Sequence, residues 1–306
     1  MDNQRQIFIE KLDRAVSCAR SLFDESLRSK ILRTLRNPKK ALLRKIIVDY
    51  FDQQRHFVLK AKTFFGRTMY VNNYEPHLWF CGMVLSPAEI RLTRYIIKHL
   101  PEKGVFFDIG AHHGLYTLLV HDLTNGATPV YAFEPAQVHT KILRKSIKGL
   151  SGVSIINAAV SSKSGTVTFY ENNRTVSTLD KSFADSEANA RLTFVEVLVP
   201  SVSVDDYCLG NDIKPTFLKI DVEGAEQAVV AGAMNVLRGV RPDVALEVWG
   251  ENNEQHLEAA HALVEIGYTP YRITEGGDIT KIAEGDSLVL AGEQFDNLLF
   301  IFDKTV

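Results

Sequence analysis

Short apolar runs alternate with segments of helical periodicity from residue 104 to the end of the chain. Apolar strands that alternate with helices are typical of a mostly parallel sheet covered by helices on both faces. The last two runs have no helical segment between them, so we expect them to form an antiparallel hairpin. The chain is therefore predicted to have an α/β fold. The expected strands are 105–109, 129–135, 153–160, 216–221, 243–249, 268–274 and 297–302.

The region before this alternation has a different pattern. Hydrophobic side chains recur about every four residues over 4–36, which predicts an amphipathic helix with a basic outer face. The proline in 37–40 ends this helix, and a second helical pattern covers 41–62. Aromatic residues in 64–82 predict short strands. The serine, proline and glutamate that open 86–104 predict the start of a helix.

These patterns divide the chain into three expected regions. Residues 1–65 form a basic helical extension, residues 66–103 lead into the core through short strands and a helix, and residues 104–306 form the main domain. Within this domain, residues 165–207 predict a β-hairpin excursion with a polar tip around 172–192.

The composition, with 45% apolar and 24% charged residues, is typical of a soluble globular protein. A net charge of −2 argues against nucleic acid as a partner. The charge is uneven, because residues 1–65 hold 15 Lys and Arg against 7 Asp and Glu, a net charge of +8. This segment predicts contact with a membrane surface, an anionic polymer or an acidic face of the same chain, with a solvated helical face as the alternative. Two exposed amphipathic helices also suggest a homodimer.

The cysteines and the N-terminus bear on the cellular compartment. Cys18, Cys81 and Cys208 have no zinc-site spacing and provide no disulfide framework, which favours a reducing compartment. The first residues are too often charged for a secretory signal, and no stretch has the apolar length of a membrane span. We therefore expect a cytoplasmic protein, with peripheral membrane contact through residues 1–65 as an added hypothesis.

Acidic residues stand at the ends of four expected strands: Asp108, Glu134, Asp221 and Glu247. In open α/β sheets, ligands bind beyond the carboxyl ends of the strands. The coincidence of four acids at such ends predicts a ligand site there.

The first of these ends has the pattern D-x-G-x-x-x-G, formed by Asp108, Gly110 and Gly114. Glycines at such a turn allow tight backbone geometry and close approach of a ligand to the free amides of a helix N-terminus. The pattern lacks the G-x-G-x-x-G spacing of a dinucleotide site. A carboxylate before the first glycine suits an amino group better than a pyrophosphate.

Glu134 ends the next strand, 26 residues after Asp108. An acid at this place commonly accepts hydrogen bonds from ribose hydroxyls, which predicts a nucleoside without distinguishing NAD from S-adenosylmethionine. The alternative is a helix-capping carboxylate, with Pro135 in the first helical position.

The third element is the segment 217–233, which begins FLKIDVEGAE. Lys219, Asp221 and Glu223 alternate and so project to one side of a strand end, where such crowding is costly unless the groups act on a ligand. The alternative is an Asp–Lys ion pair together with Glu226 stabilised by the helix dipole.

The segments VFFDIGAHHGLYTLLV, VYAFEP, IINAAVSSKSGTVTFY, LKIDVEGAE and DNLLFIF resemble the FkbM family of S-adenosylmethionine-dependent methyltransferases. The resemblance covers about residues 104–302 and is most specific in the block around Asp221. It implies a Rossmann-like class I methyltransferase fold with a seven-stranded sheet. It also implies methyl transfer to an oxygen. The leading hypothesis is therefore an O-methyltransferase that acts on a hydroxyl of a sugar, glycan or other secondary metabolite.

The resemblance assigns the methionine part of the cofactor to Asp108, Gly110 and Gly114, the ribose to Glu134, and the adenine edge to Asn157 and Ala158. The family often has asparagine where His112 stands, so the resemblance implies backbone contacts and pocket shape for this residue. The expected cofactor-binding residues are Asp108, Gly110, Ala111, His112, Gly114, Tyr116, Glu134, Pro135, Asn157, Ala158 and Asp221.

The expected residues on the acceptor side are Lys219, Asp221, Glu223, Glu247 and His113. Glu223 or His113 would take the acceptor proton, and Lys219 would orient Asp221 or the acceptor. We expect no metal at His112 and His113, because adjacent side chains diverge in most backbone conformations and no Glu-x-x-His or His-x-x-x-His partner is nearby. A nicotinamide-linked oxidoreductase and a non-catalytic cofactor- and partner-binding module are the alternative functions.

Overall fold

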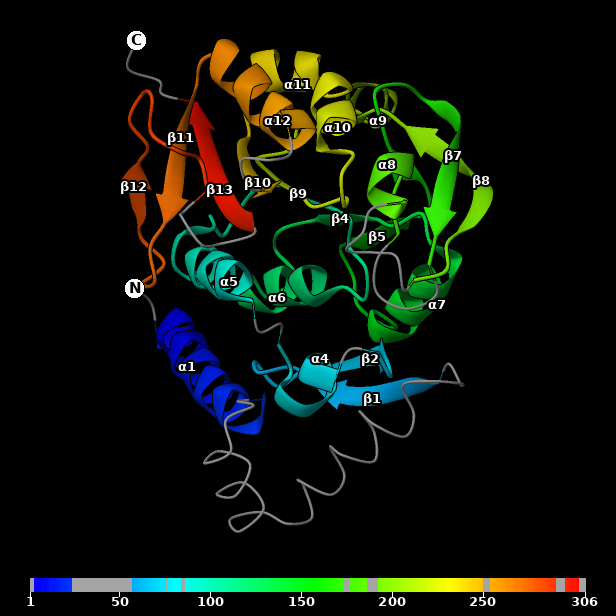
Figure 1. The fold of residues 1–306 in the computed structure, drawn as a ribbon. Helices are drawn as coiled ribbons and strands as arrows, with labels where there is room; N and C mark the ends of the chain where they lie inside the picture. Colours follow the sequence, from blue (N-terminus) through cyan, green and yellow to red (C-terminus); the bar gives the residue numbers. More distant parts are fainter. Residues whose placement is uncertain are drawn as a thin grey trace.

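A central sheet organises the computed structural model, which describes residues 3–23, 57–74, 76–83, 86–172, 177–185, 192–249, 254–289 and 295–302 (Figure 1). The sheet has eight strands in the order β12-β11-β13-β10-β9-β3-β4-β5. Its strands are β3 (Phe106–Ile109), β4 (Val130–Phe133), β5 (Val153–Ile156), β9 (Phe217–Ile220), β10 (Asp243–Trp249), β11 (Tyr268–Ile273), β12 (Ile279–Lys281) and β13 (Phe295–Phe302).

The pairing confirms the predicted mostly parallel sheet. Strands β5, β4, β3, β9 and β10 run parallel to one another, whereas β13 runs antiparallel to both β10 and β11. The predicted C-terminal antiparallel pair is therefore present. The predicted number of seven strands is wrong by one, because the three-residue β12 returns along β11 and adds an outer strand. A segment this short carries no strand periodicity that the sequence could show.

Helices cover both faces of the sheet, as the apolar character of the strands requires. Neighbouring residues of β3 enter different cores, since Phe106 packs with α5 and α6 and Phe107 packs on the side of α9 to α12. Figure 1 shows these two layers on opposite sides of the strands. The helices are α5 (Pro87–His99), α6 (Leu115–Leu123), α7 (Gln137–Ser146), α9 (Val204–Asn211), α10 (Glu226–Ala231), α11 (Met234–Gly239) and α12 (Glu254–Glu265).

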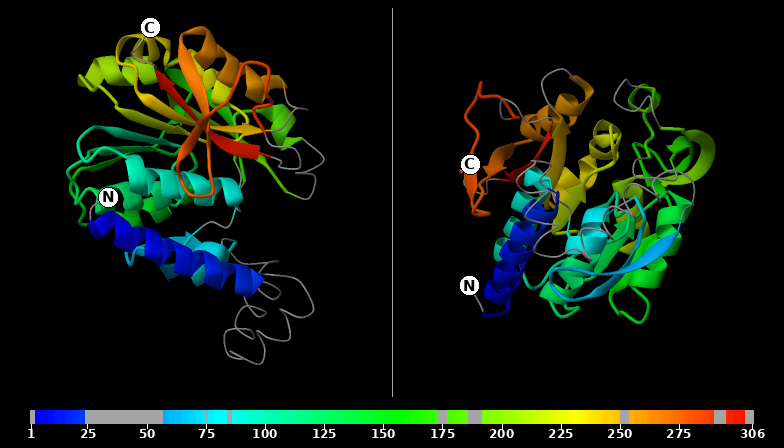
Figure 2. Two further views of the ribbon diagram at one scale, coloured as in Figure 1. Left: turned by 90° about the vertical axis from the view of Figure 1, so that its left-hand side faces the viewer. Right: turned by 60° about the horizontal axis from the view of Figure 1, so that its bottom comes forward.

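The N-terminal helix α1 (Asn3–Phe23) packs against the domain. Phe8, Leu12 and Val16 are buried in the same core as α5 and α6, and Figure 2 shows α1 lying along this side of the molecule. Arg5 is buried and donates hydrogen bonds to the carbonyls of Ile97 (2.9 Å) and Leu100 (2.6 Å). These carbonyls end α5 and would otherwise lack partners, so Arg5 caps one helix from another.

The helix predicted over 4–36 is confirmed as far as residue 23, and its remainder lies outside the described residues. Most of the helix predicted over 41–62 also lies outside them. Its last part is wrong, because β1 (Val58–Lys62) pairs antiparallel with β2 (Thr68–Asn72). The residues of β1 alternate between exposed and more buried positions, and this period of two competes with the helical pattern.

The strands predicted within 64–82 are confirmed only in β2, because α4 (Pro76–Cys81) is a helix. The aromatic residues that favoured a strand here pack against α1 and the β1–β2 pair instead. The helix predicted over 86–104 is confirmed as α5, although the hydroxyl of Ser86 makes no capping hydrogen bond.

The predicted excursion is confirmed as the antiparallel pair β7 (Gly165–Glu171) and β8 (Val195–Val202). β6 (Ala159–Val160) joins β8 in a separate three-stranded sheet, so the strand predicted over 153–160 is divided between two sheets. The short helix α8 (Lys181–Ala184) lies between β7 and β8 in the chain. Among the described residues, none of the helices has the length and apolar character needed to cross a membrane.

Candidate active site

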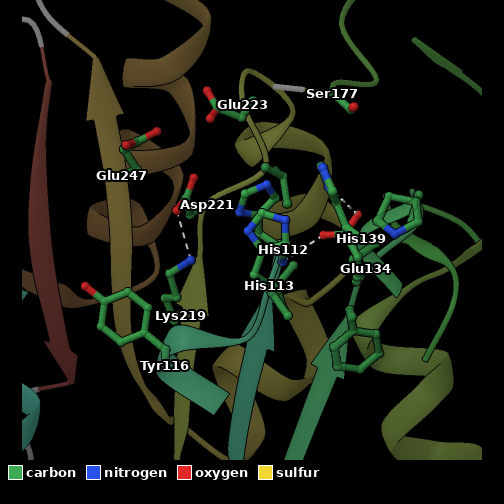
Figure 3. A pocket seen from close by; sticks show the side chains of 18 of the residues that line it. His112, His113, Tyr116, Glu134, His139, Ser177, Lys219, Asp221, Glu223 and Glu247 are labelled. Carbon is green, nitrogen blue, oxygen red and sulfur yellow. Dashed lines mark hydrogen bonds and ion pairs between the residues drawn. The ribbon is translucent and has the colours of Figure 1, made fainter. Parts of the chain in front are cut away.

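A cavity of about 300 Å³ opens where β3, β4, β9 and β10 end (Figure 3). This is the edge at which the four strand-end acids were expected, and a volume of this order suits a small ligand. Most of the predicted site residues line it: Gly110, Ala111, His112, His113, Tyr116, Glu134, Pro135, Ala158, Lys219, Asp221, Glu223 and Glu247. The predicted residues Asp108, Gly114 and Asn157 lie outside the lining.

Gly110 brings the turn after β3 against the turn after β9. It has a positive φ of 84°, and a Cβ atom at this position would lie 1.7 Å from the carbonyl oxygen of Asp221. The amides of Gly110 and Ala111 both donate to the carbonyl of Phe133 at the end of β4 (3.1 and 3.0 Å). Only glycine fits this three-way contact, so the turn that lines the cavity has a fixed shape.

Lys219 is a buried cation below the cavity. Its Nζ atom lies 2.9 Å from Asp221 Oδ2 and 3.9 Å from Asp108 Oδ1, and 5.2 Å from the centre of the Tyr116 ring. Burial lowers the pKa of Lys219, but Asp221, Asp108 and Glu89 more than offset this and hold the pKa above its usual value. Lys219 therefore stays protonated at neutral pH and balances the carboxylates around it.

Asp108 lies under the cavity wall and is 1% exposed. Its Oδ2 atom accepts a hydrogen bond from the Thr117 hydroxyl (2.6 Å). Burial raises the pKa of Asp108, and Lys219 together with the Thr117 hydroxyl partly offsets this. Asp108 thus sets the position of Lys219 and of the first turn of α6 without facing the cavity.

A carboxyl group that the sequence analysis missed, Glu89 of α5, also lines the cavity. It accepts hydrogen bonds from the hydroxyl of Tyr116 (2.6 Å) and from Asn297 Nδ2 (3.0 Å). One oxygen each of Glu89, Asp221 and Glu247 lie within 4.8 Å of one another. The sequence offered Glu89 only as part of a helix start, and nothing in the pattern connected α5 with the ends of β9 and β10.

These acids perturb one another because they share a buried site. Burial, followed by repulsion from Asp221, raises the pKa of Glu89. The same two causes raise the pKa values of Glu223 and Glu247 well above their usual range. Glu247 also accepts a hydrogen bond from Trp249 Nε1 (2.9 Å). The site therefore contains carboxyl groups that are stronger bases than an ordinary glutamate.

Glu223 has a positive φ of 56°, which is uncommon for a residue with a side chain. Glu226 holds this turn by accepting hydrogen bonds from the amides of Val222 (3.1 Å) and Gly224 (3.1 Å). The Thr178 hydroxyl donates to the carbonyl of Glu223, which connects the turn to the excursion. Glu226 is thus a structural residue, and Glu223 points towards the cavity as Figure 3 shows.

Glu134 is held by backbone amides at the cavity wall. Its two carboxylate oxygens accept hydrogen bonds from the amides of His112 and Ala136 (both 2.8 Å). Asn157 donates from Nδ2 to the carbonyls of Glu134 (2.9 Å) and Pro135 (3.0 Å). Asn157 therefore fixes this turn instead of facing the cavity. Helix α7 begins only at residue 137, so Pro135 is not in its first position.

The adjacent histidines His112 and His113 do not diverge, contrary to the expectation from sequence. Their ring centres lie 3.8 Å apart, because His112 adopts a positive φ of 50° that departs from ordinary extended and helical backbone. His139 of α7 lies beside them, with its ring centre 4.1 Å from that of His112. Burial, followed by the nearby imidazoles, lowers the pKa values of His112 and His113 well below the usual value. Both rings are neutral at neutral pH.

Comparison with known proteins places this chain in a family. A family model described as the methyltransferase FkbM domain matches residues 108–298. The hexuronic acid methyltransferase AglP of Haloferax volcanii is 25% identical over 155 residues, which cover 50% of this chain and 59% of that protein. The methyltransferase sdnD of Sordaria araneosa is 30% identical over 184 residues, with 51% of this chain and 70% of that protein covered.

Among solved structures, the methyltransferase FkbM of Methylobacillus flagellatus matches 69% of this chain and 48% of its own, with 16% identity and a TM-score of 0.43. The chain thus spans less than two thirds of the length of the first of the curated relatives and about half of this solved chain.

Proposed function

The chain belongs to the FkbM methyltransferase family, and we propose that it transfers a methyl group from S-adenosylmethionine to a hydroxyl oxygen of a sugar, glycan or other secondary metabolite. One observation carries this proposal. A single cavity joins a glycine-shaped turn and the Glu134 carboxylate on one side to Lys219, Asp221, Glu223 and Glu247 on the other.

The residues present fit such a cofactor. The turn at Gly110 leaves no room for a side chain, so backbone is presented to the cavity at the helix end, as close ligand approach requires. Each oxygen of Glu134 accepts one amide hydrogen bond and keeps a further lone pair for a ligand hydroxyl. Gly110, Ala111, His112 and Glu134 would hold the cofactor, which supplies a methyl group activated by a positively charged sulfonium.

The acidic wall of the cavity suits the reaction. One carboxyl oxygen each of Asp221, Glu89 and Glu247 lie within 4.8 Å of one another, and such a wall favours a cationic donor over a neutral one. Lys219 holds Asp221 in place, because the buried ammonium group lies 2.9 Å from the partly exposed carboxylate. These residues act by holding charge at fixed positions, which lowers the cost of reorganisation during transfer.

Glu223 is the residue that we assign as the base. Its raised pKa makes the ionised carboxylate a stronger proton acceptor than an exposed glutamate. Glu223 would accept the proton of the acceptor hydroxyl and keep it on its carboxyl group. The O–CH3 bond would form as the S–CH3 bond of the donor breaks, which would leave S-adenosylhomocysteine as the second product. The buried imidazole of His113 suits this role less, since its low pKa makes it a weak base.

The sugar character of the acceptor is supported by one relative, whose name states that it methylates a hexuronic acid. The decisive experiment is incubation of the purified chain with S-adenosylmethionine labelled in the methyl group and a panel of neutral and acidic sugars, glycans and hydroxylated metabolites. We expect label in the acceptor as a methyl ether. Cofactor binding by calorimetry without transfer to any acceptor would support a non-catalytic binding module instead.

We further propose that the protein is cytoplasmic and that its basic N-terminal segment contacts an anionic membrane surface. The support is the net charge of +8 over residues 1–65 and the free thiols of all three cysteines. A membrane surface is where lipid-linked glycan acceptors would be found.

A further inference from the structure

Three histidine side chains from two separate elements meet in the cavity wall. His112 and His113 follow β3, and His139 lies in the first turn of α7. One ring nitrogen of each lies within 4.8 Å of those of the other two. Nitrogen ligands about 2.0–2.1 Å from a tetrahedral ion lie about 3.4 Å from one another, so rotation of these side chains brings them within range of a single metal ion.

Their ring nitrogens lack the partners that buried imidazoles normally have. His113 is 1% exposed and His139 is 2% exposed. Neither nitrogen of His113, nor the Nε2 atoms of His112 and His139, has a hydrogen-bond partner among the residues that the structure describes. Unpartnered buried polar atoms are costly, so four of them in one small cluster point to a ligand that pairs with them.

The surrounding charges also suit a cation. Glu134 Oε1 lies 3.7 Å from His139 Nδ1, on the opposite side of the ring from the unpartnered Nε2 atom. A carboxylate behind a ligating imidazole orients the ring and makes the other nitrogen a better donor. The nearby charge of Lys219 is already balanced by its ion pair with Asp221.

We propose that His112, His113 and His139 form a binding site for one transition-metal ion of the Zn²⁺ or Co²⁺ class. Three imidazole ligands suit these ions, and the cavity beside them leaves a fourth coordination position open to water or a ligand.

The position of this site has a consequence for the cofactor, and this part rests on the proposed function. His112 donates its amide to Glu134, the residue assigned to the cofactor, so the metal and the cofactor share one wall of the cavity. A metal ion bound to the three rings therefore competes with the cofactor, and its removal by a chelator strengthens cofactor binding.

The test is metal binding by the untagged, chelator-treated full chain without any cofactor. We expect one Zn²⁺ per chain by calorimetry and visible absorption bands of a four-coordinate site on titration with Co²⁺. His112→Asn is the informative variant, because asparagine tolerates the left-handed backbone at this position. It should weaken Zn²⁺ and Co²⁺ binding at least about tenfold, since a ligand contributes at least as much as a residue behind it.

His261→Asn is the matched control, because His261 is exposed on α12 and remote in sequence from the three rings. Its metal binding should equal that of the parent protein. His139→Gln provides a second removal, with far-UV circular dichroism and melting temperature showing that each variant is folded. Absence of stoichiometric metal binding by the parent protein would overturn the site. Metal affinity equal to that of the parent protein in the folded His112→Asn and His139→Gln variants would also overturn it.

Titration with S-adenosylhomocysteine, with and without Zn²⁺, separates this proposal from the proposed function. Metal binding in a chain that does not bind S-adenosylhomocysteine keeps the metal site and rejects the methyltransferase. S-adenosylhomocysteine binding in a chain that takes up no metal rejects the metal site and keeps the methyltransferase.

Discussion

Lys219 Nζ lies 2.9 Å from Asp221 Oδ2, and both side chains come from the same strand end, where β9 leaves the sheet. Lys219 also lies 3.9 Å from Asp108 at the end of β3, so one cation joins two neighbouring strands below the cavity. Since Lys219 is buried, its charge holds two carboxylates that would otherwise repel each other. The Lys219–Asp221 pair therefore contributes both to the stability of the domain and to the arrangement of charge in the cavity.

Replacement of this lysine should therefore cost both stability and activity. We expect Lys219→Met to lower the free energy of unfolding by about 3–5 kcal/mol, because it leaves buried carboxylates without their counter-ion. We also expect turnover to fall at least about 100-fold. Denaturant unfolding and steady-state rates measure the two effects. Lys214→Met is the control, since Lys214 is exposed, and equal behaviour of the two variants would refute the role of the pair.

Glu223→Gln should separate chemistry from binding. The amide keeps the size of the side chain but cannot accept the acceptor proton, so we expect kcat to fall about 10²–10⁴-fold. The affinity for S-adenosylhomocysteine, measured by calorimetry, should stay within about twofold, because Glu134 and the Gly110 turn are untouched. A parallel loss of affinity would place Glu223 on the cofactor side instead.

The pH dependence of turnover should reveal the same carboxyl group. Burial and Asp221 raise the pKa of Glu223 well above the value of 4.5 of an ordinary glutamate, so the base becomes ionised only above this raised pKa. We expect kcat to rise with pH through a limb placed well above pH 4.5 and to lose this limb in Glu223→Gln. A rate profile that is unchanged by the substitution would exclude Glu223 as the base.

The raised pKa of Glu223 also predicts how the free energy of unfolding depends on pH. A carboxyl group whose pKa is higher in the folded chain than in the unfolded chain stabilises the fold fully below the unfolded pKa. This contribution is lost as pH rises from about 4.5 through the folded pKa. The free energy of unfolding of Glu223→Gln should therefore increase relative to that of the parent protein as pH rises through this window. An unchanged difference between the two across the window would contradict the raised pKa.

Gly110→Ala tests the contact between the turns after β3 and β9. Gly110 and Gly149 both have a φ of 84°, but a Cβ at Gly149 meets no atom within 4 Å, whereas one at Gly110 meets the Asp221 carbonyl. We expect Gly149→Ala to cost about 1–2 kcal/mol from backbone strain alone. Gly110→Ala should cost about 1–3 kcal/mol more and abolish cofactor binding. Denaturant unfolding checks the difference, and equal costs would show that the turns are not in contact.

The proposed membrane contact is tested by charge removal. Replacing the four Lys and Arg of residues 33–40 with glutamine should weaken binding to anionic vesicles at least about tenfold, since each basic residue near such a surface contributes about 1 kcal/mol. The four Lys and Arg of residues 141–148 provide a control of equal charge. Co-sedimentation with anionic and neutral vesicles measures both, and equal losses from the two sets would contradict a specific N-terminal contact.

Much of the fold was predictable because the strands that flank the site are short, apolar and separated by helices. β10 has the bounds that its apolar run predicted, and the strand-end acids Glu134, Asp221 and Glu247 line one cavity. These features follow from local periods and from the rule that parallel strands present their carboxyl ends at one edge.

The missed residues come from elements that only the tertiary structure brings to this edge. Glu89 lies on α5 and His139 on α7, and nothing in their local sequence distinguishes them from other helical residues. The convergence of His112 and His113 also depends on the positive φ of His112, which no residue pattern in the sequence predicts. Such contacts depend on packing between distant segments, and a local pattern does not contain that information.

The central claim is methyl transfer at the cavity that joins Glu134 to Glu223, and direct transfer of labelled methyl tests it. With labelled S-adenosylmethionine and a hydroxylated sugar panel, we predict one labelled methyl ether and an equal amount of S-adenosylhomocysteine from the parent chain. Glu223→Gln should give about 10²–10⁴-fold less of both in the same time. Label transferred equally by Glu223→Gln, or no binding of S-adenosylmethionine at micromolar concentration, would contradict this account.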